Sequence, residues 1–122
     1  MTHYLVDASN VIGSRPDGWW RDRKAADERL IAALARLPSG EDHYTVVLDR
    51  GGKNWEHDGV TVLHASRPGR NAADDRIVDE VEQADDVDDL VIVTGDRELR
   101  CRVEERGARV ASARRFRDQL DF

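Results

Sequence analysis

The sequence predicts one α/β domain of three layers, α/β/α, in which helices cover both faces of a central, mainly parallel sheet of about five strands. Short apolar segments typical of strands alternate with helix-like segments along the chain, and a helix is the usual connection between parallel strands. The length of 122 residues is well below the ~250 at which chains usually divide into several domains. We therefore expect a single domain over residues 1–122.

Five segments are predicted as strands because each is short and apolar and ends at an acid or a turn signal. They are His3–Asp7, Tyr44–Asp49, Val60–His64, Leu90–Thr94 and Ala108–Ser112. A loop, Arg50–Gly59, separates the second strand from the third. Leu90–Thr94 (LVIVT) is the most apolar segment of the chain, which predicts a central strand buried on both faces.

Four segments are predicted as helices. They are Trp20–Leu37, Ala72–Gln83, Arg97–Arg106 and Arg114–Leu120. The first carries an apolar stripe at helical spacing, formed by Ala26, Leu30, Ala33, Leu34 and Leu37. The second repeats apolar residues every four positions, at Ala73, Ile77 and Val81. Pro38-Ser39-Gly40 ends the first helix.

The composition excludes several classes of protein. No apolar run approaches the ~20 residues of a membrane-spanning helix, so no membrane partner is expected. Met1-Thr2-His3 leads directly into the first predicted strand, which leaves no room for a signal peptide. The single cysteine, Cys101, excludes an internal disulfide framework and an all-cysteine metal site. We expect a cytoplasmic protein.

The net charge of −6 hides an uneven distribution of charge. Residues 72–89 hold nine acids and one arginine, whereas residues 97–117 hold eight arginines and three glutamates. A chain divided in this way can bind a polyanion despite its negative total. Arginine supplies 17 of the 19 cations and suits bidentate phosphate contacts, although codon usage in a GC-rich genome would enrich it as well.

Aspartates follow the predicted strands. Asp7 ends the first strand, Asp49 ends the second, and Asp96 follows the fourth after one glycine. Asp74 and Asp75 open the helix that follows the third strand. In a parallel sheet these positions share the carboxyl edge, where open α/β folds bind ligands. If the first and fourth strands are neighbours, Asp7 and Asp96 face each other across the crevice.

Several carboxylates in one pocket repel one another unless a cation compensates their charge. Because the pattern offers oxygen ligands without His or Cys, we expect Mg²⁺ or Mn²⁺ rather than zinc. Such an ion activates a water molecule and neutralises a leaving oxygen, which suits hydrolysis of a phosphodiester bond. Asn10, three residues after Asp7, can orient a ligand or bind phosphate through its amide.

Some of these acids also have a structural interpretation. Asp74 is a helix N-terminal acid of the kind that the helix dipole favours, and Asp96 can cap the helix that follows it. Asp7, directly after an apolar strand, has no comparable role. The acids that precede the fourth strand are assigned to a solvated turn without chemistry; they are Asp85, Asp86, Asp88 and Asp89.

Six segments, in order along the chain, carry a family resemblance. They are LVDASNVIG at 5–13, VVLDRGG at 46–52, GVTVLHA at 59–65, NAADDRIVDEV at 71–81, VIVTGDREL at 91–99 and GARVAS at 107–112. Together they resemble the NYN domain ribonucleases, most closely the YacP-like branch, within the wider PIN-like nuclease fold. The resemblance covers nearly the whole chain, and the ordered set is specific although each segment alone is not.

This resemblance implies an endoribonuclease that depends on Mg²⁺ or Mn²⁺, and some family members act on RNA in association with ribosomes. It implies Asp7, Asp74 and Asp96 as the metal-binding acids, with Asn10 as the motif asparagine and Asp49 as an auxiliary acid. Asp75 stands at a position that varies among relatives. The chain departs from the family where relatives often read D-G-Y-N and T-S-D, since Asp7-Ala8-Ser9-Asn10 and Thr94-Gly95-Asp96 stand here.

A pocket of carboxylates repels RNA, so we expect cations around it. The candidate RNA-binding residues are Arg15, Trp19, Arg50, Lys53, Arg67, Arg70, Arg97 and Arg100. A tryptophan near arginines can stack on a base, which contributes ~1–3 kcal/mol per base. For Trp20 we expect instead that it starts the first helix and packs into the core. Arg97 and Arg100 also fit a solvated helix face.

The sequence thus predicts a metal-dependent endoribonuclease that hydrolyses single-stranded RNA with water as the nucleophile. Asp7, Asp74 and Asp96 would hold the ion, supported by Asp49, Asp75 and Asn10. The alternative is a non-catalytic RNA- or ribosome-binding module that keeps a relic acidic pocket. A phosphoacceptor signalling domain is disfavoured, because it needs a lysine after the last strand, where Ser112-Ala113-Arg114 stands.

Overall fold

The computed structural model describes residues 2–37, 40, 42–65, 67, 71–120 and 122. Its sheet has six strands in the order β3-β4-β2-β1-β5-β6. The strands are β1 (His3–Asp7), β2 (His43–Leu48), β3 (Trp55–His57), β4 (Val60–His64), β5 (Leu90–Thr94) and β6 (Arg109–Ser112). The helices are α1 (Ala8–Gly13), α2 (Arg23–Ala35), α3 (Ala72–Gln83), α4 (Arg97–Glu104) and α5 (Ala113–Asp118), with the short 3₁₀ turns η1 (Trp19–Arg21) and η2 (Val87–Asp89). The predicted α/β fold with a mainly parallel sheet is confirmed.

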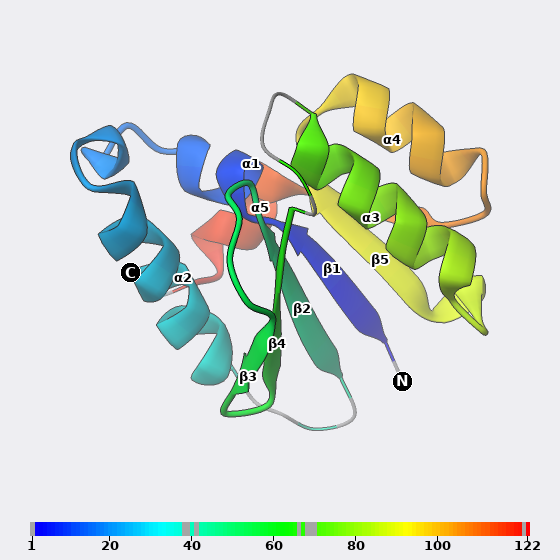
Figure 1. Cartoon of the computed structure of the whole chain (residues 1–122), viewed down its shortest axis with the longest axis horizontal. Helices are drawn as coiled ribbons and strands as arrows, with labels where there is room; N and C mark the ends of the chain where they lie inside the picture. The colour runs from blue at the N-terminus through cyan, green and yellow to red at the C-terminus, as the bar shows by residue number, and fades with distance from the viewer. Residues whose placement is uncertain (1, 38–39, 41, 66, 68–70, 121) are drawn as a thin grey trace.

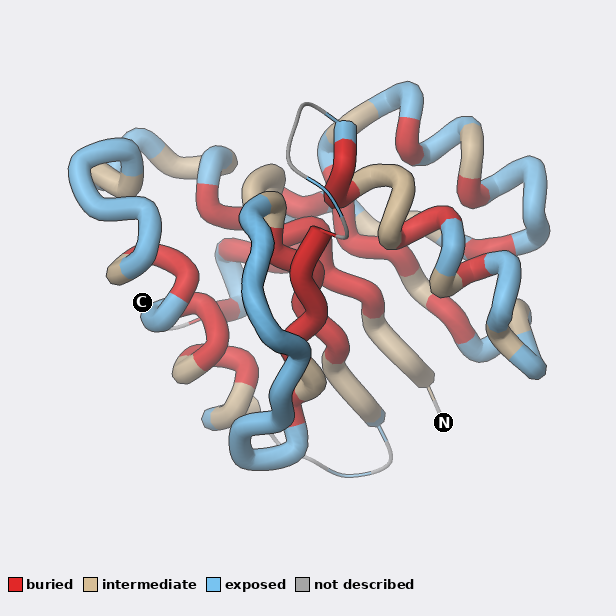
Figure 2. Tube along the Cα trace, viewed as in Figure 1, coloured by how far each residue is buried: buried red, intermediate tan, exposed pale blue. Residues whose placement is uncertain are grey.

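Helices cover both faces of the sheet (Figure 1), because successive residues of a strand point to opposite faces. On β1, Val6 packs in a core cluster with α1, α2 and α5, whereas Leu5 packs in a second cluster with α3 and α4. Val46 and Val47 divide between the two clusters in the same way on β2. Figure 2 shows the result, with buried residues along the strands and on the sides of the helices that face them.

The order of the strands creates a crevice beside β1. The strand β1 pairs in parallel with β2 on one side and with β5 on the other. The chain therefore passes outward through β2 and β4, then crosses β1 to form β5 and β6. The predicted contact between the first and fourth predicted strands is confirmed, with Val6 opposite Val93. Ligands of open α/β sheets bind at the carboxyl end of such a reversal.

The predicted loop Arg50–Gly59 is wrong in part, because it contains the short strand β3. This strand pairs antiparallel with β4, so that Trp55 lies opposite Val62. The two strands are joined by Asp58 and Gly59, which have positive φ values of 48° and 83°. Positive φ at both central residues is typical of a tight two-residue hairpin, and Asp-Gly is the sequence signal for it.

The predicted first helix, Trp20–Leu37, begins later than expected. The side chain of Asp22 accepts a hydrogen bond from the backbone N–H of Ala25 at 3.1 Å and so caps α2, which starts at Arg23. The helix α1, which follows β1 without a loop, was not predicted at all, because six residues are too few to show a helical period. The predicted stop at Pro38-Ser39 lies outside the described residues.

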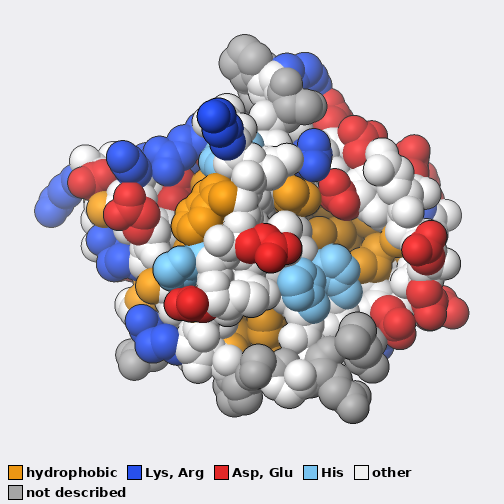
Figure 3. All heavy atoms as spheres, turned by 60° about the horizontal axis from the view of Figure 1, so that its bottom comes forward, with side chains coloured by type: hydrophobic (Ala, Val, Ile, Leu, Met, Phe, Trp, Pro, Cys, Tyr) orange, Lys and Arg blue, Asp and Glu red, His pale blue; other side chains and the backbone are white. Residues whose placement is uncertain are grey.

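The acidic segment of the sequence forms a distinct region of the surface. Figure 3 shows acidic side chains gathered on the side of the molecule where α3 and the turn after it lie. Within the part of the chain that the structure describes, no helix has the length and apolar character needed to cross a membrane.

Candidate active site

A polar pocket of about 230 Å³ lies at the carboxyl edge of the sheet, and we call it the carboxyl-edge pocket. Its lining residues are Ser9, Asn10, Asp49, Asn71, Ala72, Ala73, Asp74 and Asp96. Asp49 follows β2, Asp74 lies in the first turn of α3, and Asp96 lies between β5 and α4. The fold therefore brings three predicted acids and Asn10 together, and no cation is among the described residues that line the pocket.

Asp7 lies beneath this pocket rather than in its lining. Its side chain is 1% exposed, and its carboxylate accepts three side-chain hydrogen bonds. The donors are Asn10 Nδ2 at 2.6 Å, Thr94 Oγ1 at 2.9 Å and Ser9 Oγ at 3.2 Å. Burial raises the pKa of Asp7, and these hydrogen bonds oppose the rise because they favour the charged form. The hydrogen bond to Asp7 thus fixes the orientation of the Asn10 side chain at the base of the pocket.

Asp74 has a raised pKa. Burial, together with the neighbouring carboxylates of Asp7 and Asp96, raises the pKa of Asp74 to about 6, while Arg102 opposes the rise. The carboxylates are therefore close enough to repel one another. A proton relieves this repulsion below about pH 6, and a bound cation would relieve it above that pH.

Asp96 has the structural role that the sequence offered as an alternative. Its Oδ1 accepts hydrogen bonds from the backbone N–H groups of Glu98 at 2.8 Å and Leu99 at 3.1 Å, so it caps α4. Its own backbone N–H donates to Thr94 Oγ1 at 3.1 Å, and that hydroxyl donates to Asp7. Both caps use Oδ1, so capping leaves Oδ2 available to a ligand. A structural and a functional role are compatible here.

The potential metal-ligating atoms of the carboxyl-edge pocket suit a hard divalent cation. They are carboxylate, amide and hydroxyl oxygens, which Mg²⁺ and Mn²⁺ prefer. Burial and the carboxylates of Asp7 and Asp96 raise the pKa of Asp74 although Arg102 opposes the rise, so a bound cation would favour the charged form of Asp74. With the side chains placed as they are, no three His, Cys, Asp or Glu residues among those described converge closely enough to ligate a common ion. Metal binding would therefore require side chains to turn.

Asp75 does not reach this pocket. Its carboxylate lies between Arg67 and Arg102, with Arg102 Nη1 at 3.1 Å. The hydrogen bonds from these two arginines hold the pKa of Asp75 below its usual range. The carboxylate is thus already neutralised by two cations, in contrast to Asp74 one residue before it.

The predicted RNA-binding cations are largely engaged with acids of the chain. Four of them form ion pairs, namely Arg15 with Asp118, Arg50 with Asp27, Arg67 with Asp75 and Arg100 with Glu104. Lys53 and Arg97 are exposed, and Arg70 lies outside the described residues. Surface pairs of this kind are weak, so an RNA phosphate can replace the carboxylate. Arg50 is different, because its partner Asp27 is buried.

The two adjacent tryptophans are placed opposite to expectation. Trp19 is partly buried and packs against the core, with Arg23 over its ring at 5.4 Å. Trp20, predicted to pack inside, is 51% exposed. The reason is that α2 starts only at Arg23, so Trp20 lies on a separate 3₁₀ turn and not on the apolar stripe of the helix.

Sequence reasoning missed three residues of this site. Asn71 lines the pocket and begins α3 with a φ of 68°, a left-handed conformation that asparagine tolerates. Thr94, a polar residue at the end of a buried strand, links Asp96 to Asp7. At Gly95 an added Cβ would lie 3.3 Å from Asn10 Oδ1, so the absence of a side chain there gives the Asn10 amide room.

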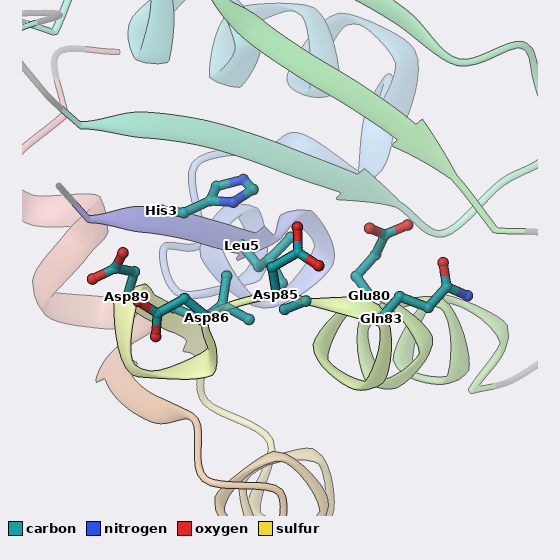
Figure 4. Close-up of a pocket in the computed structure, with 9 residues that line it drawn as sticks. His3, Leu5, Glu80, Gln83, Asp85, Asp86 and Asp89 are labelled. Atoms are coloured by element: carbon teal, nitrogen blue, oxygen red, sulfur yellow. The ribbon is translucent and has the colours of Figure 1, made fainter.

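A second acidic pocket, of about 360 Å³, lies at the amino-terminal edge of the sheet. Figure 4 shows its acids, Glu80, Asp85, Asp86 and Asp89, around His3 and Leu5. The sequence predicted a solvated turn for the three aspartates, and they lie at the surface between α3 and β5. The pocket is at the opposite end of the strands from Asp74.

Comparison with known proteins identifies related folds. Residues 4–122 match the family described as the YacP-like NYN domain. Two crystal structures of Rae1 (YacP) from Bacillus subtilis are similar to this chain. A tryptophan-to-leucine mutant has a TM-score of 0.77 and 25% identity, covering 97% of this chain and 76% of that one. A second structure has a TM-score of 0.71 and 26% identity, covering 97% and 74%. No curated protein matches the chain significantly.

Proposed function

The chain belongs to the family of YacP-like NYN domains, which are nuclease-like, and from that premise we propose a metal-dependent endoribonuclease. Its substrate is single-stranded RNA, and its cofactor is Mg²⁺ or Mn²⁺. The observation that carries the proposal is the carboxyl-edge pocket, which Asp49, Asp74 and Asp96 line without a cation among the described lining residues. The raised pKa of Asp74 supports it, because burial and two neighbouring carboxylates disfavour the charged form there, and a cation would relieve this.

Asp74 and Asp96 are the proposed principal ligands, with Asp49 as an auxiliary one. When bound, the ion would lower the pKa of the attacking water and neutralise charge on the leaving oxygen. Asp49 is held by Arg23, whose Nη2 lies 2.7 Å from Asp49 Oδ2, so that pair must loosen if Asp49 is to ligate. We leave Asp75 out of the ligand set, because two arginines already neutralise it.

Asp7 acts below the proposed ligands, and Asn10 lines the pocket beside them. The negative charge of Asp7 raises the pKa of Asp74, and it makes the binding of a cation beside Asp74 more favourable. Asp7 also accepts a hydrogen bond from Asn10 Nδ2, which fixes the amide that lines the pocket. Asn10 Oδ1 is the other polar atom of that side chain, and it is available to a substrate hydroxyl or to a water molecule.

The test uses Asp74→Asn and Asp96→Asn with a fluorescent single-stranded RNA and a matched duplex. An asparagine at position 96 can still cap α4, so that variant separates charge from folding. With Mg²⁺ or Mn²⁺ we expect internal cleavage of the single strand by the wild type, no cleavage in EDTA, and a loss of about a hundredfold or more in both variants. Asp85→Asn, in the pocket at the amino-terminal edge, is the charge-matched control. Wild-type cleavage by Asp74→Asn would refute the assignment.

A non-catalytic RNA-binding module is the second candidate function. The engagement of Asp49 by Arg23 and of Asp96 by the α4 backbone favours it. Under that alternative the wild type binds the single-stranded RNA and yields no products with either ion. The binding would tighten in Asp74→Asn, because a repulsive charge is removed.

A further inference from the structure

A second pocket at the carboxyl edge has the opposite charge. It has a volume of about 330 Å³, within the range of small-ligand sites, and we call it the His64 pocket. Its lining residues are Gly51, Gly52, Asn54, His64, Ala65, Arg67 and Arg76. The described lining contains two arginines and no acid, whereas that of the carboxyl-edge pocket contains three acids and no cation.

His64 is a buried polar residue with an unpartnered ring atom. Its side chain is at the end of β4, the residue is only 9% exposed, and Nδ1 has no hydrogen-bond partner among the described residues. The other side of the ring lies against Gly52, where an added Cβ would be 2.7 Å from Nε2. The ring is therefore confined, and the backbone of Lys53 hydrogen-bonds it, while Nδ1 is left unpaired among the described residues. An unpaired buried polar atom is unfavourable and needs a specific explanation.

Arg76 provides a second unpartnered atom in the same pocket. Its Nε is buried without a hydrogen-bond partner in the described part of the chain, although its Nη2 pairs with Glu80 at 3.2 Å. The guanidinium of arginine only donates hydrogen bonds, so Nε requires an acceptor. Arg67, the other cation of the pocket, is exposed. An anion with several acceptor oxygens, such as a phosphate group, is the complementary ligand.

The His64 pocket lies beside the proposed catalytic centre. His64 pairs with Leu48, the residue before Asp49. Arg76 lies two residues after Asp74, on α3. Gly51 and Gly52 follow Asp49 after one residue; the ring of His64 fills the space beside Gly52, whereas an added Cβ at Gly51 would meet nothing within 4 Å. The two pockets thus draw lining residues from the same two segments, the chain just after β2 and the first turns of α3.

We infer that the His64 pocket binds a backbone phosphate of the RNA, adjacent to the phosphodiester that lies at the acids. This inference rests on the proposed function for the identity of the ligand. It adds Arg76 and His64, which carry the unpartnered atoms, to the residues that hold the substrate. It also assigns a reason to Gly52, since a side chain there would displace His64.

The first test measures RNA binding in EDTA, without metal and without cleavage. The probe is a short labelled oligouridylate, titrated at several salt concentrations. We expect Arg76→Gln to weaken binding by about three- to tenfold and to reduce the slope of log affinity against log salt by about 0.7, the value for one contact to a single strand. Arg29→Gln removes the same charge from an exposed site on α2 and should bind as the wild type does. Equal affinity and slope in the two variants would overturn the inference.

The second test distinguishes an RNA phosphate from a free anion. Inorganic phosphate is titrated while the ring nitrogens of His64 are followed by NMR, and its competition with the oligouridylate is measured in parallel. A shift of the His64 signals together with competition supports the inference. A shift without competition would overturn it, because the pocket would then serve a free anion. Gly52→Ala, checked for folding by circular dichroism, should weaken RNA binding in the same way as Arg76→Gln.

The outcome is separable from that of the proposed nuclease. If Arg76→Gln weakens binding but the wild type cleaves no RNA with either metal, the pocket assignment stands and the catalytic proposal fails. If Asp74→Asn abolishes cleavage while Arg76→Gln binds RNA as Arg29→Gln does, the catalytic proposal stands and the pocket assignment fails.

Discussion

The amide Nδ2 of Asn10 donates a hydrogen bond of 2.6 Å to Oδ2 of Asp7, the oxygen that also accepts the hydroxyl of Thr94. This pair joins the buried end of β1 to the lining of the carboxyl-edge pocket. Because the amide nitrogen of Asn10 binds Asp7, the amide oxygen points away from Asp7, and it lies 3.3 Å from the position that a Cβ at Gly95 would occupy. The buried acid therefore determines which polar atom of Asn10 is presented to a ligand.

Replacing Asn10 by Ala should lower the rate of RNA cleavage by about ten- to a hundredfold while the protein stays folded. It removes a hydrogen bond that lowers the pKa of Asp7, so the pKa of Asp7 rises further. The acidic limb of the pH–rate profile should then move to higher pH. Ser9→Ala, which removes the longer 3.2 Å bond, should give a smaller shift. An unchanged profile in Asn10→Ala would contradict the positioning role.

Replacing Asp74 by Asn should stabilise the metal-free protein at neutral pH. The pKa of Asp74 is about 6 in the folded state, against an ordinary value of 3.8, so the folded protein binds more protons between these values and loses stability as the pH rises through them. Because Asp74 is partly exposed, solvent screening reduces the gain in free energy of unfolding to about 1 kcal/mol. Urea denaturation near pH 7 and near pH 4 measures it.

The gain in Asp74→Asn should be absent near pH 4, where Asp74 is protonated in the wild type as well. Addition of Mg²⁺ should stabilise the wild type more than the variant. Asp85→Asn serves as the control and should show neither effect. A variant that is less stable than the wild type at both pH values would show that Asp74 is not under charge repulsion.

We expect Arg50 to stabilise the fold through its ion pair with Asp27, apart from any contact that it makes with RNA. It lies 3.2 Å from Asp27, whose side chain is 3% exposed, and burial raises the pKa of Asp27 to about 6 despite this pairing. In Arg50→Gln the buried carboxylate loses its partner, so the free energy of unfolding should fall by about 1–3 kcal/mol near pH 8.

The loss in Arg50→Gln should shrink as the pH falls below about 6, since Asp27 then becomes neutral in the folded state. Urea denaturation across this range tests the point, and Asp27→Asn combined with Arg50→Gln should recover part of the loss. A pH-independent effect would mean that Arg50 stabilises the fold by packing alone.

Substitutions of Trp19 and Trp20 should affect different properties, the first the stability of the fold and the second the binding of RNA. Trp19 packs against the core, so Trp19→Ala should lower the free energy of unfolding by about 2–4 kcal/mol. Trp20 is exposed, so Trp20→Ala should change stability by less than about 0.5 kcal/mol. If bases stack on Trp20, its loss weakens single-stranded RNA binding by about 1–3 kcal/mol. The opposite pattern, with stability lost only in Trp20→Ala, would contradict the structure.

The sequence predicted the layers and the parallel order because burial leaves a recognisable pattern in the sequence. Examples are the apolar strand Leu90–Thr94 and the four-residue repeat of Ala73, Ile77 and Val81. It did not predict α1 or η1, since segments of six and three residues are too short to show a period. The hairpin of β3 and β4 had a signal in Asp58-Gly59, which the loop interpretation did not use.

The candidate site was predictable as far as the fold places strand ends together. Asp49, Asp74, Asp96 and Asn10 line one pocket, as the shared carboxyl edge requires. What each acid contacts was not predictable, because it depends on side-chain partners from distant segments. Arg102 lies 27 residues after Asp75 and forms an ion pair with it. No local sequence pattern predicts this contact.

The measurement closest to the central claim is Mn²⁺ binding followed by electron paramagnetic resonance in the absence of RNA. We expect that the wild type binds Mn²⁺ above pH 6, that binding weakens as Asp74 takes up a proton below about pH 6, and that Asp74→Asn loses it while Asp85→Asn keeps it. Equal binding by Asp74→Asn and the wild type, or no binding by the wild type, would contradict the claim that the aspartates of the carboxyl edge hold a divalent cation.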